Sequence, residues 1–152
     1  MTEMTAHSTE HATFVIERSF PAPPAQVFAA WASAEAKARW FGPRTSEGYE
    51  LEFRVGGHER FAADGPDGAR YVYAAAYCDI VAERRIVYTY EMYRDDERIS
   101  VSVATIELAP AAEGTELTLT EQGVFLDGHD NVGAREHGTR ALIERLAGAV
   151  AA

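Results

Sequence analysis

Between residues 47 and 125, apolar side chains recur at every second position, and this alternation limits the possible folds more than any other feature of the sequence. A period of two is typical of a β-strand that buries one face. Turn-forming residues interrupt the alternation, for example at residues 56–57 and 64–68. Such short turns join antiparallel neighbours, because a parallel pair needs a crossover of about a dozen residues or more. The pattern therefore predicts an antiparallel meander.

Segments with helical spacing flank this meander. A first strand at residues 12–20 is followed by prolines and by apolar residues on one helical face, and Ser33 can cap a second short helix. Near the other end, Asp130 or Asn131 can cap a long helix over residues 132–150. This order predicts an α+β fold in which a curved antiparallel sheet of about seven strands wraps the C-terminal helix.

The composition is that of one soluble domain. A length of 152 residues suits a single core, which we place at residues 12–150, after a disordered tail at residues 1–11. The net charge of −10 disfavours nucleic acid and anionic membranes as partners. The N-terminus lacks the pattern of a signal peptide, and Cys78 is the single cysteine. We therefore expect a cytoplasmic protein without an internal disulfide.

A curved sheet that wraps a helix leaves a cavity between the two, and we expect a small, largely apolar or aromatic ligand there. The alternation places Tyr88 and Tyr90 on the inner face of the sheet. Tyrosines suit the wall of such a pocket because each combines an apolar ring with one hydroxyl. The apolar residues expected to line the cavity are Leu51, Phe53, Phe61, Tyr88, Tyr90, Leu119 and Leu142.

Charged residues are expected to face the same cavity. Glu59 alternates with Phe61 on the inner face, where a carboxylate is costly unless it is paired or solvated. Glu121 also points inward, and Arg135 shares the inner stripe of the last helix with Thr139. These groups could orient a ligand. Alternatively, the phase of the short strand that carries Glu59 is wrong, and Glu121 and Arg135 form a structural ion pair.

Motifs for metals and cofactors are not found in the sequence. No His and Cys spacing resembles a zinc site, no Gly-rich loop suits a phosphate, and no Gly-x-Ser-x-Gly elbow marks a hydrolase. We therefore expect no cofactor. Valine and threonine on the outer face of the sheet make a homodimer a further expectation.

Several segments share their order and spacing with one protein family: residues 18–24 with Val27, Phe28 and Trp31, then residues 38–43, 53–57, 77–89, 114–120 and 136–138. Over about residues 12–150, the chain resembles the bacterial branch of the activator of heat-shock protein 90 ATPase homologue-like proteins, within the START-like (SRPBCC, helix-grip) superfamily. The resemblance implies a helix-grip fold. Gly138 is followed by threonine where the family often has tryptophan, and we attribute this glycine to a close approach of helix and sheet.

The superfamily includes lipid carriers, polyketide cyclases and co-chaperones, so a shared fold leaves the activity open. Our leading interpretation is a protein that binds an apolar ligand. The alternative is an enzyme similar to polyketide cyclases and dehydratases, with Glu59 or Glu121 as acid or base and Tyr88 as a hydroxyl donor. A co-chaperone is less expected, because eukaryotic relatives carry an additional domain that this chain lacks.

Overall fold

The computed structural model describes residues 7–42 and 47–151. In these residues, one antiparallel sheet is combined with three helices. The helices are α1 (Pro24–Ala29), α2 (Ala34–Ala38) and α3 (Val132–Ala151). The strands are β1 (Thr9–Phe20), β2 (Glu47–Leu51), β3 (His58–Asp64), β4 (Arg70–Val81), β5 (Arg85–Arg94), β6 (Glu97–Ala111) and β7 (Gly114–Leu126).

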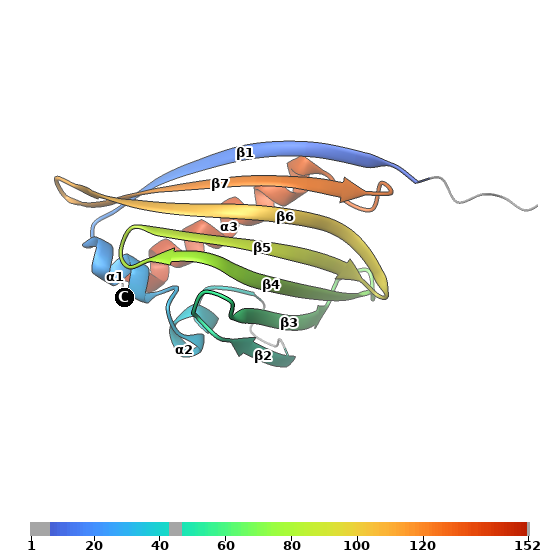
Figure 1. Ribbon diagram of the computed structural model, residues 1–152, viewed down its shortest axis with the longest axis horizontal. Helices are drawn as coiled ribbons and strands as arrows, with labels where there is room; N and C mark the ends of the chain where they lie inside the picture. The colour runs from blue at the N-terminus through green and yellow to red at the C-terminus, as the bar shows by residue number, and fades with distance from the viewer. Residues whose placement is uncertain (1–6, 43–46, 152) are drawn as a thin grey trace, which may run out of the picture.

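The strand order across the sheet is β1-β7-β6-β5-β4-β3-β2, and neighbouring strands are antiparallel. Strands β2 to β7 form the predicted meander, and β1 pairs with the last strand of that meander. Figure 1 shows α3 lying across one face of the curved sheet, with α1 and α2 near one end of it. This arrangement confirms the predicted α+β helix-grip fold.

The core lies between the sheet and α3. The helix contributes Ile143, Leu146 and Val150, which are all buried and belong to the apolar stripe predicted from the sequence. The sheet contributes alternating residues such as Ile106 and Leu117, which are also fully buried. Because the strand period and the helix period both direct apolar side chains into the same space, the two layers share one core.

Side chains cap both helices for which caps were predicted. The N–H of Ala36 donates a hydrogen bond of 3.1 Å to Ser33 Oγ at the start of α2. Of the two candidates before α3, Asn131 is the cap, because its Oδ1 accepts a hydrogen bond of 2.9 Å from the N–H of Ala134. Asp130 is thereby left to bind another group.

Two boundaries differ from the predictions. Strand β1 begins at Thr9, so residues 9–11 of the expected tail pair with β7, whereas residues 1–6 lie outside the described part of the chain. The second difference is the end of β2, which stops at Leu51, so that Val55 is 56% exposed. The alternation in the sequence continues to residue 55, whereas the backbone already turns there, with the N–H of Arg54 bonded to the carbonyl of Glu52.

Candidate functional site

A cavity of about 310 Å³ lies between the inner face of the sheet and α3. Strands β3, β4, β5 and β7 supply one wall, α3 supplies the opposite wall, and the chain after α2 contributes an edge. Seven of the residues named from the sequence line this cavity: Phe61, Tyr88, Tyr90, Glu121, Arg135, Thr139 and Leu142.

Four other residues expected at the cavity lie elsewhere. Leu119 is buried in the core, and the ring of Phe53 packs against other aromatic rings. Leu51 is half-buried in β2, and Glu59 belongs to a separate buried network. The inner face of the sheet is longer than the cavity, so an inward orientation does not by itself bring a side chain to the cavity.

Tyr73, which was not among the cavity residues expected from the sequence, lies at the centre of the aromatic wall. Its ring centroid is 5.2 Å from that of Phe61, 5.1 Å from that of Phe41 and 5.0 Å from that of Tyr90. Tyr73 is opposite Phe61 in the register of β3 and β4. That pairing was the signal that could have identified Tyr73, because opposed residues of paired strands share one face.

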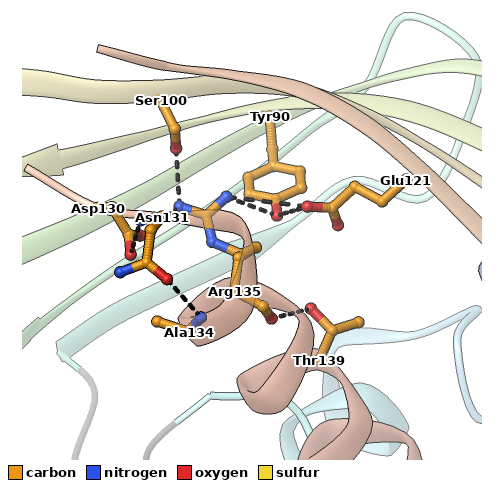
Figure 2. A network of polar contacts seen from close by, with 8 residues as sticks. All are labelled: Tyr90, Ser100, Glu121, Asp130, Asn131, Ala134, Arg135 and Thr139. Carbon is orange, nitrogen blue, oxygen red and sulfur yellow. Dashed lines mark hydrogen bonds and ion pairs between the residues drawn. The ribbon is translucent and has the colours of Figure 1, made fainter. Parts of the chain in front are cut away.

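A polar cluster forms one end of the cavity (Figure 2). The Tyr90 hydroxyl donates a hydrogen bond of 2.7 Å to Glu121 Oε2, and Arg135 Nη1 donates one of 3.0 Å to the Tyr90 hydroxyl. Arg135 Nη2 donates to Ser100 Oγ at 2.8 Å and to Asp130 Oδ2 at 3.0 Å. The guanidinium also lies 3.8 Å from Glu121 Oε2. The cluster therefore ties β7 to α3, as the structural alternative predicted, while it also lines the cavity.

Two oxygens in this cavity lack partners among the described residues. The buried Tyr73 hydroxyl makes no hydrogen bond of acceptable geometry, although the Tyr88 hydroxyl is nearby. Glu121 Oε1 accepts no hydrogen bond, because both Tyr90 and Arg135 contact Oε2. Burial raises the pKa of Glu121, whereas Tyr90 and Arg135 act in the opposite direction. Glu121 Oε1 is therefore an acceptor that a polar ligand atom in the cavity could contact, whereas the Tyr73 hydroxyl is covered by the protein.

Two residues of α3 at the cavity differ from the expectations. The Thr139 hydroxyl donates a hydrogen bond of 2.9 Å to the carbonyl of Arg135, so it satisfies its own helix rather than joining the carboxylate cluster. A Cβ added at Gly138 would meet no atom within 4 Å. The attribution of Gly138 to a close approach of helix and sheet is therefore wrong, because this glycine faces open space at the cavity.

Glu59 is inward-facing as predicted, but it pairs with Lys37 instead of reaching the cavity. Lys37 Nζ lies 2.6 Å from Glu59 Oε1, and both side chains are fully buried. The hydroxyls of Tyr77 and Tyr49 donate to the same carboxylate at 2.8 and 2.7 Å. The Lys37 ammonium is also 4.2 Å from the ring centroid of Phe41, and burial lowers its pKa against the pull of Glu59.

Sequence reasoning missed Lys37, although one signal was available. Lys37 is the only lysine among the 14 basic residues of the chain. An ammonium is a compact cation that fits between aromatic rings and a single carboxylate oxygen, whereas the planar guanidinium favours bidentate contacts. The lone lysine of an arginine-rich chain was therefore a signal of a site that suits an ammonium group.

Within residues 7–42 and 47–151, no three His, Cys, Asp or Glu side chains lie close enough to hold a metal ion together. In that same part of the chain, no helix is long and apolar enough to cross a membrane.

A family model described as activator of Hsp90 ATPase homolog 1-like protein matches residues 21–151. The chain belongs to this family. The match begins immediately after β1 and extends through α3, so it includes every residue that lines the cavity.

Solved structures of bacterial proteins support this assignment. An uncharacterised protein from Rhizobium leguminosarum is 44% identical, with a TM-score of 0.92, over 96% of this chain and 98% of its own. The Mll3558 protein from Rhizobium loti is 42% identical, with a TM-score of 0.86, over 93% and 99%. The CV1439 protein from Chromobacterium violaceum is 27% identical, with a TM-score of 0.72, over 91% and 96%. Among proteins of curated function, none is significantly similar to the chain described here.

Proposed function

We propose that this protein binds a small, largely apolar or aromatic ligand in the cavity between the sheet and α3. The observation that carries the proposal is an aromatic wall beside Glu121 Oε1, a carboxylate oxygen that accepts no hydrogen bond from the described residues. Ligand pockets combine apolar walls with a few polar groups that fix orientation. A cavity that served only as a packing defect would be lined by apolar atoms, without a carboxylate or a guanidinium.

The cavity volume indicates the size of the ligand. An apolar cavity of about 150 Å³ in another protein holds one benzene ring. The cavity described above measures about 310 Å³, which is near the lower end of the range of about 300–1,000 Å³ for ligand pockets. A molecule of two fused rings with one short polar substituent would fit this space.

The first experiment is native mass spectrometry of protein purified without detergent, followed by titration with 2-naphthalenemethanol in a calorimeter. We expect either a discrete bound mass or saturable binding of one probe molecule per chain. Absence of both a bound mass and saturable binding would contradict the proposal. The same spectrum tests the homodimer, which stays a prediction.

A matched pair of glycine variants locates the binding. Gly138 and Gly148 both lie in α3, and a Cβ at either position meets no atom within 4 Å, but only Gly138 lines the cavity. Gly138→Leu should weaken probe binding about tenfold or more by occupying cavity space, whereas Gly148→Leu should leave it unchanged. Equal affinities for the two variants would place the probe outside this cavity.

An enzyme similar to cyclases and dehydratases is the second candidate, and one observation favours it. Glu121 lines the cavity with a raised pKa, and a carboxyl group with a raised pKa is suited to proton transfer near neutral pH. Glu59 is a poor candidate for this role, since Lys37, Tyr49 and Tyr77 surround its carboxylate. Turnover of a poly-carbonyl substrate that survives Glu121→Gln would exclude this version.

A further inference from the structure

Glu121 gives the polar end of the cavity a hydrogen-bond acceptor without a partner. Its Oε1 accepts no hydrogen bond from the described residues, because Tyr90 and Arg135 both contact Oε2. The charge of Arg135 is already paired with the carboxylates of Glu121 and Asp130, and three of its five N–H groups donate to protein oxygens. A ligand atom at this end therefore meets a carboxylate oxygen that has no partner.

The charges at the polar end also favour a cation over an anion. Two carboxylates, those of Glu121 and Asp130, surround the single guanidinium of Arg135. Both Glu121 and Arg135 are largely buried, with side chains 5% and 11% exposed, so solvent screens their field weakly. With both acids ionised, the polar end carries an excess of one negative charge.

The aromatic wall favours a cation over an anion. The rings of Phe61, Tyr73 and Tyr90 line the cavity and contact one another. The face of an aromatic ring carries partial negative charge, so it attracts an ammonium group and repels a carboxylate. The protein already uses this attraction beside the cavity, where the Lys37 ammonium lies over the ring of Phe41.

We propose that the cavity selects apolar ligands whose polar group is a hydrogen-bond donor, an ammonium group above all, and rejects carboxylates of the same skeleton. The ammonium donates to Glu121 Oε1, and the rings surround the adjoining carbon atoms. The inference rests on the proposed function and adds the chemical class of the ligand to it.

Arg145 is the main competing feature of the same cavity. Its guanidinium forms no ion pair with any described residue, although its Nε donates a hydrogen bond of 3.1 Å to the carbonyl of Trp40. Arg145 is exposed, so water and salt weaken its attraction for an anion. The buried Glu121 should therefore dominate the choice of ligand.

Three probes that share one skeleton test the inference: 2-(aminomethyl)naphthalene, 2-naphthalenemethanol and 2-naphthoic acid. Calorimetry at pH 7 should give the amine an affinity about tenfold or more above that of the acid, with the alcohol between them. Glu121→Gln should reduce the affinity of the amine to that of the alcohol while the alcohol still binds, which shows that the variant is folded.

The control separates this contact from the general negative charge of the protein. Glu107 lies on the outer face of β6, away from the cavity, and Glu107→Gln changes the net charge by the same amount. We expect this variant to keep the preference for the amine. A preference lost equally in both variants would overturn the assignment to Glu121.

The remaining outcomes distinguish the two proposals. Equal affinities for the three probes would overturn the selectivity and leave the binding function in place. Tightest binding of 2-naphthoic acid, abolished by Arg145→Gln, would overturn the selectivity and assign the cavity to anions. Binding of none of the probes, together with no bound mass in the native spectrum, would overturn both proposals.

Discussion

Lys37 and Glu59 are the most unusual residues in this protein, because two complete charges are removed from water. Each side chain is fully buried, and the pair is completed by two tyrosine hydroxyls and the ring of Phe41. A buried ion pair repays its desolvation only when its geometry is good and its remaining atoms are bonded. Here both carboxylate oxygens accept hydrogen bonds. Either charged residue without its partner would destabilise the protein, whereas the complete pair offsets the cost of burial.

Lys37→Met should therefore destabilise the protein by about 3–5 kcal/mol, because Glu59 would keep a buried charge without a partner. The double variant Lys37→Met/Glu59→Gln should lose less than the sum of the two single variants, since no charge is then stranded. Urea unfolding of all four proteins measures this coupling. Strict additivity of the two losses would show that the pair does not act as a unit.

At Glu121, burial destabilises the ionised carboxylate that the proposed contact with an ammonium group requires. Burial raises its pKa, so the folded protein holds this proton more firmly than the unfolded chain does. The stabilisation that results is complete below the unfolded-state pKa of about 4.3 and is lost as the pH rises through the higher folded-state pKa.

Glu121→Gln should accordingly become more stable relative to the wild-type protein as the pH rises from 4 to 8. The amide oxygen can still accept the hydrogen bond from Tyr90, and Arg135 keeps Asp130. Urea midpoints of both proteins across this pH range make the comparison. A stability difference that does not change with pH would mean that the Glu121 carboxyl titrates alike in the folded and unfolded states.

At the scale of elements, the turn between β2 and β3 sets the start of the strand that carries Glu59. Gly56 has a φ of +84°, a left-handed conformation that glycine adopts without strain. A Cβ at Gly57 would overlap the carbonyl oxygen of Glu52 and lie 2.9 Å from that of Arg54. The tight turn thus requires glycine, and it brings β3 back along β4 with Glu59 opposite Ala75.

Gly57→Ala should destabilise the protein by about 1–3 kcal/mol, because the backbone of β2 must move to admit the methyl group. Gly148→Ala is the control, since a Cβ there meets nothing within 4 Å, and it should stabilise α3 by about 0.5–1 kcal/mol. Thermal unfolding of the two variants tests both signs. A neutral Gly57→Ala would mean that the turn relaxes at little cost.

At the scale of the whole molecule, the cavity results from the match between a curved sheet and one straight helix. Helix α3 packs on the sheet through Ile143, Leu146 and Val150 towards its C-terminal end. Towards its N-terminal end, Arg135 holds the helix to β5 and β7 through polar contacts instead of close apolar packing. The space between these two attachments is the cavity, so the same polar cluster that positions the helix also lines the cavity.

Relatives of this protein share its fold. The match covers residues 21–151, and relatives from Rhizobium leguminosarum and Rhizobium loti keep the fold with TM-scores of 0.92 and 0.86. A shared fold does not carry a shared ligand, because specificity depends on a few side chains at the site. Under the proposed function, those side chains are the aromatic wall and the cluster of Tyr90, Glu121 and Arg135.

Local periodicity in the sequence was enough to predict the meander, the final helix and the inward orientation of Glu59 and Glu121. Each of these depends on neighbours within a few positions along the chain, which is the range over which strand and helix periods act. The same reasoning failed at β2, where alternating residues continue into a turn. It also could not place Lys37, because α2 has only five residues and so no full stripe of a helix.

By itself, the sequence determined the order of elements, the curved sheet around α3 and the faces on which the tyrosines lie. Only the tertiary structure decided which inward residues reach the cavity and which are partnered elsewhere. Glu59 and Glu121 both point inward, but their surroundings differ. Lys37, which is 22 residues from Glu59 in the chain, pairs with Glu59, whereas Glu121 lines the cavity. The physical reason is that burial and pairing depend on distances between elements, which local side-chain periodicity does not encode.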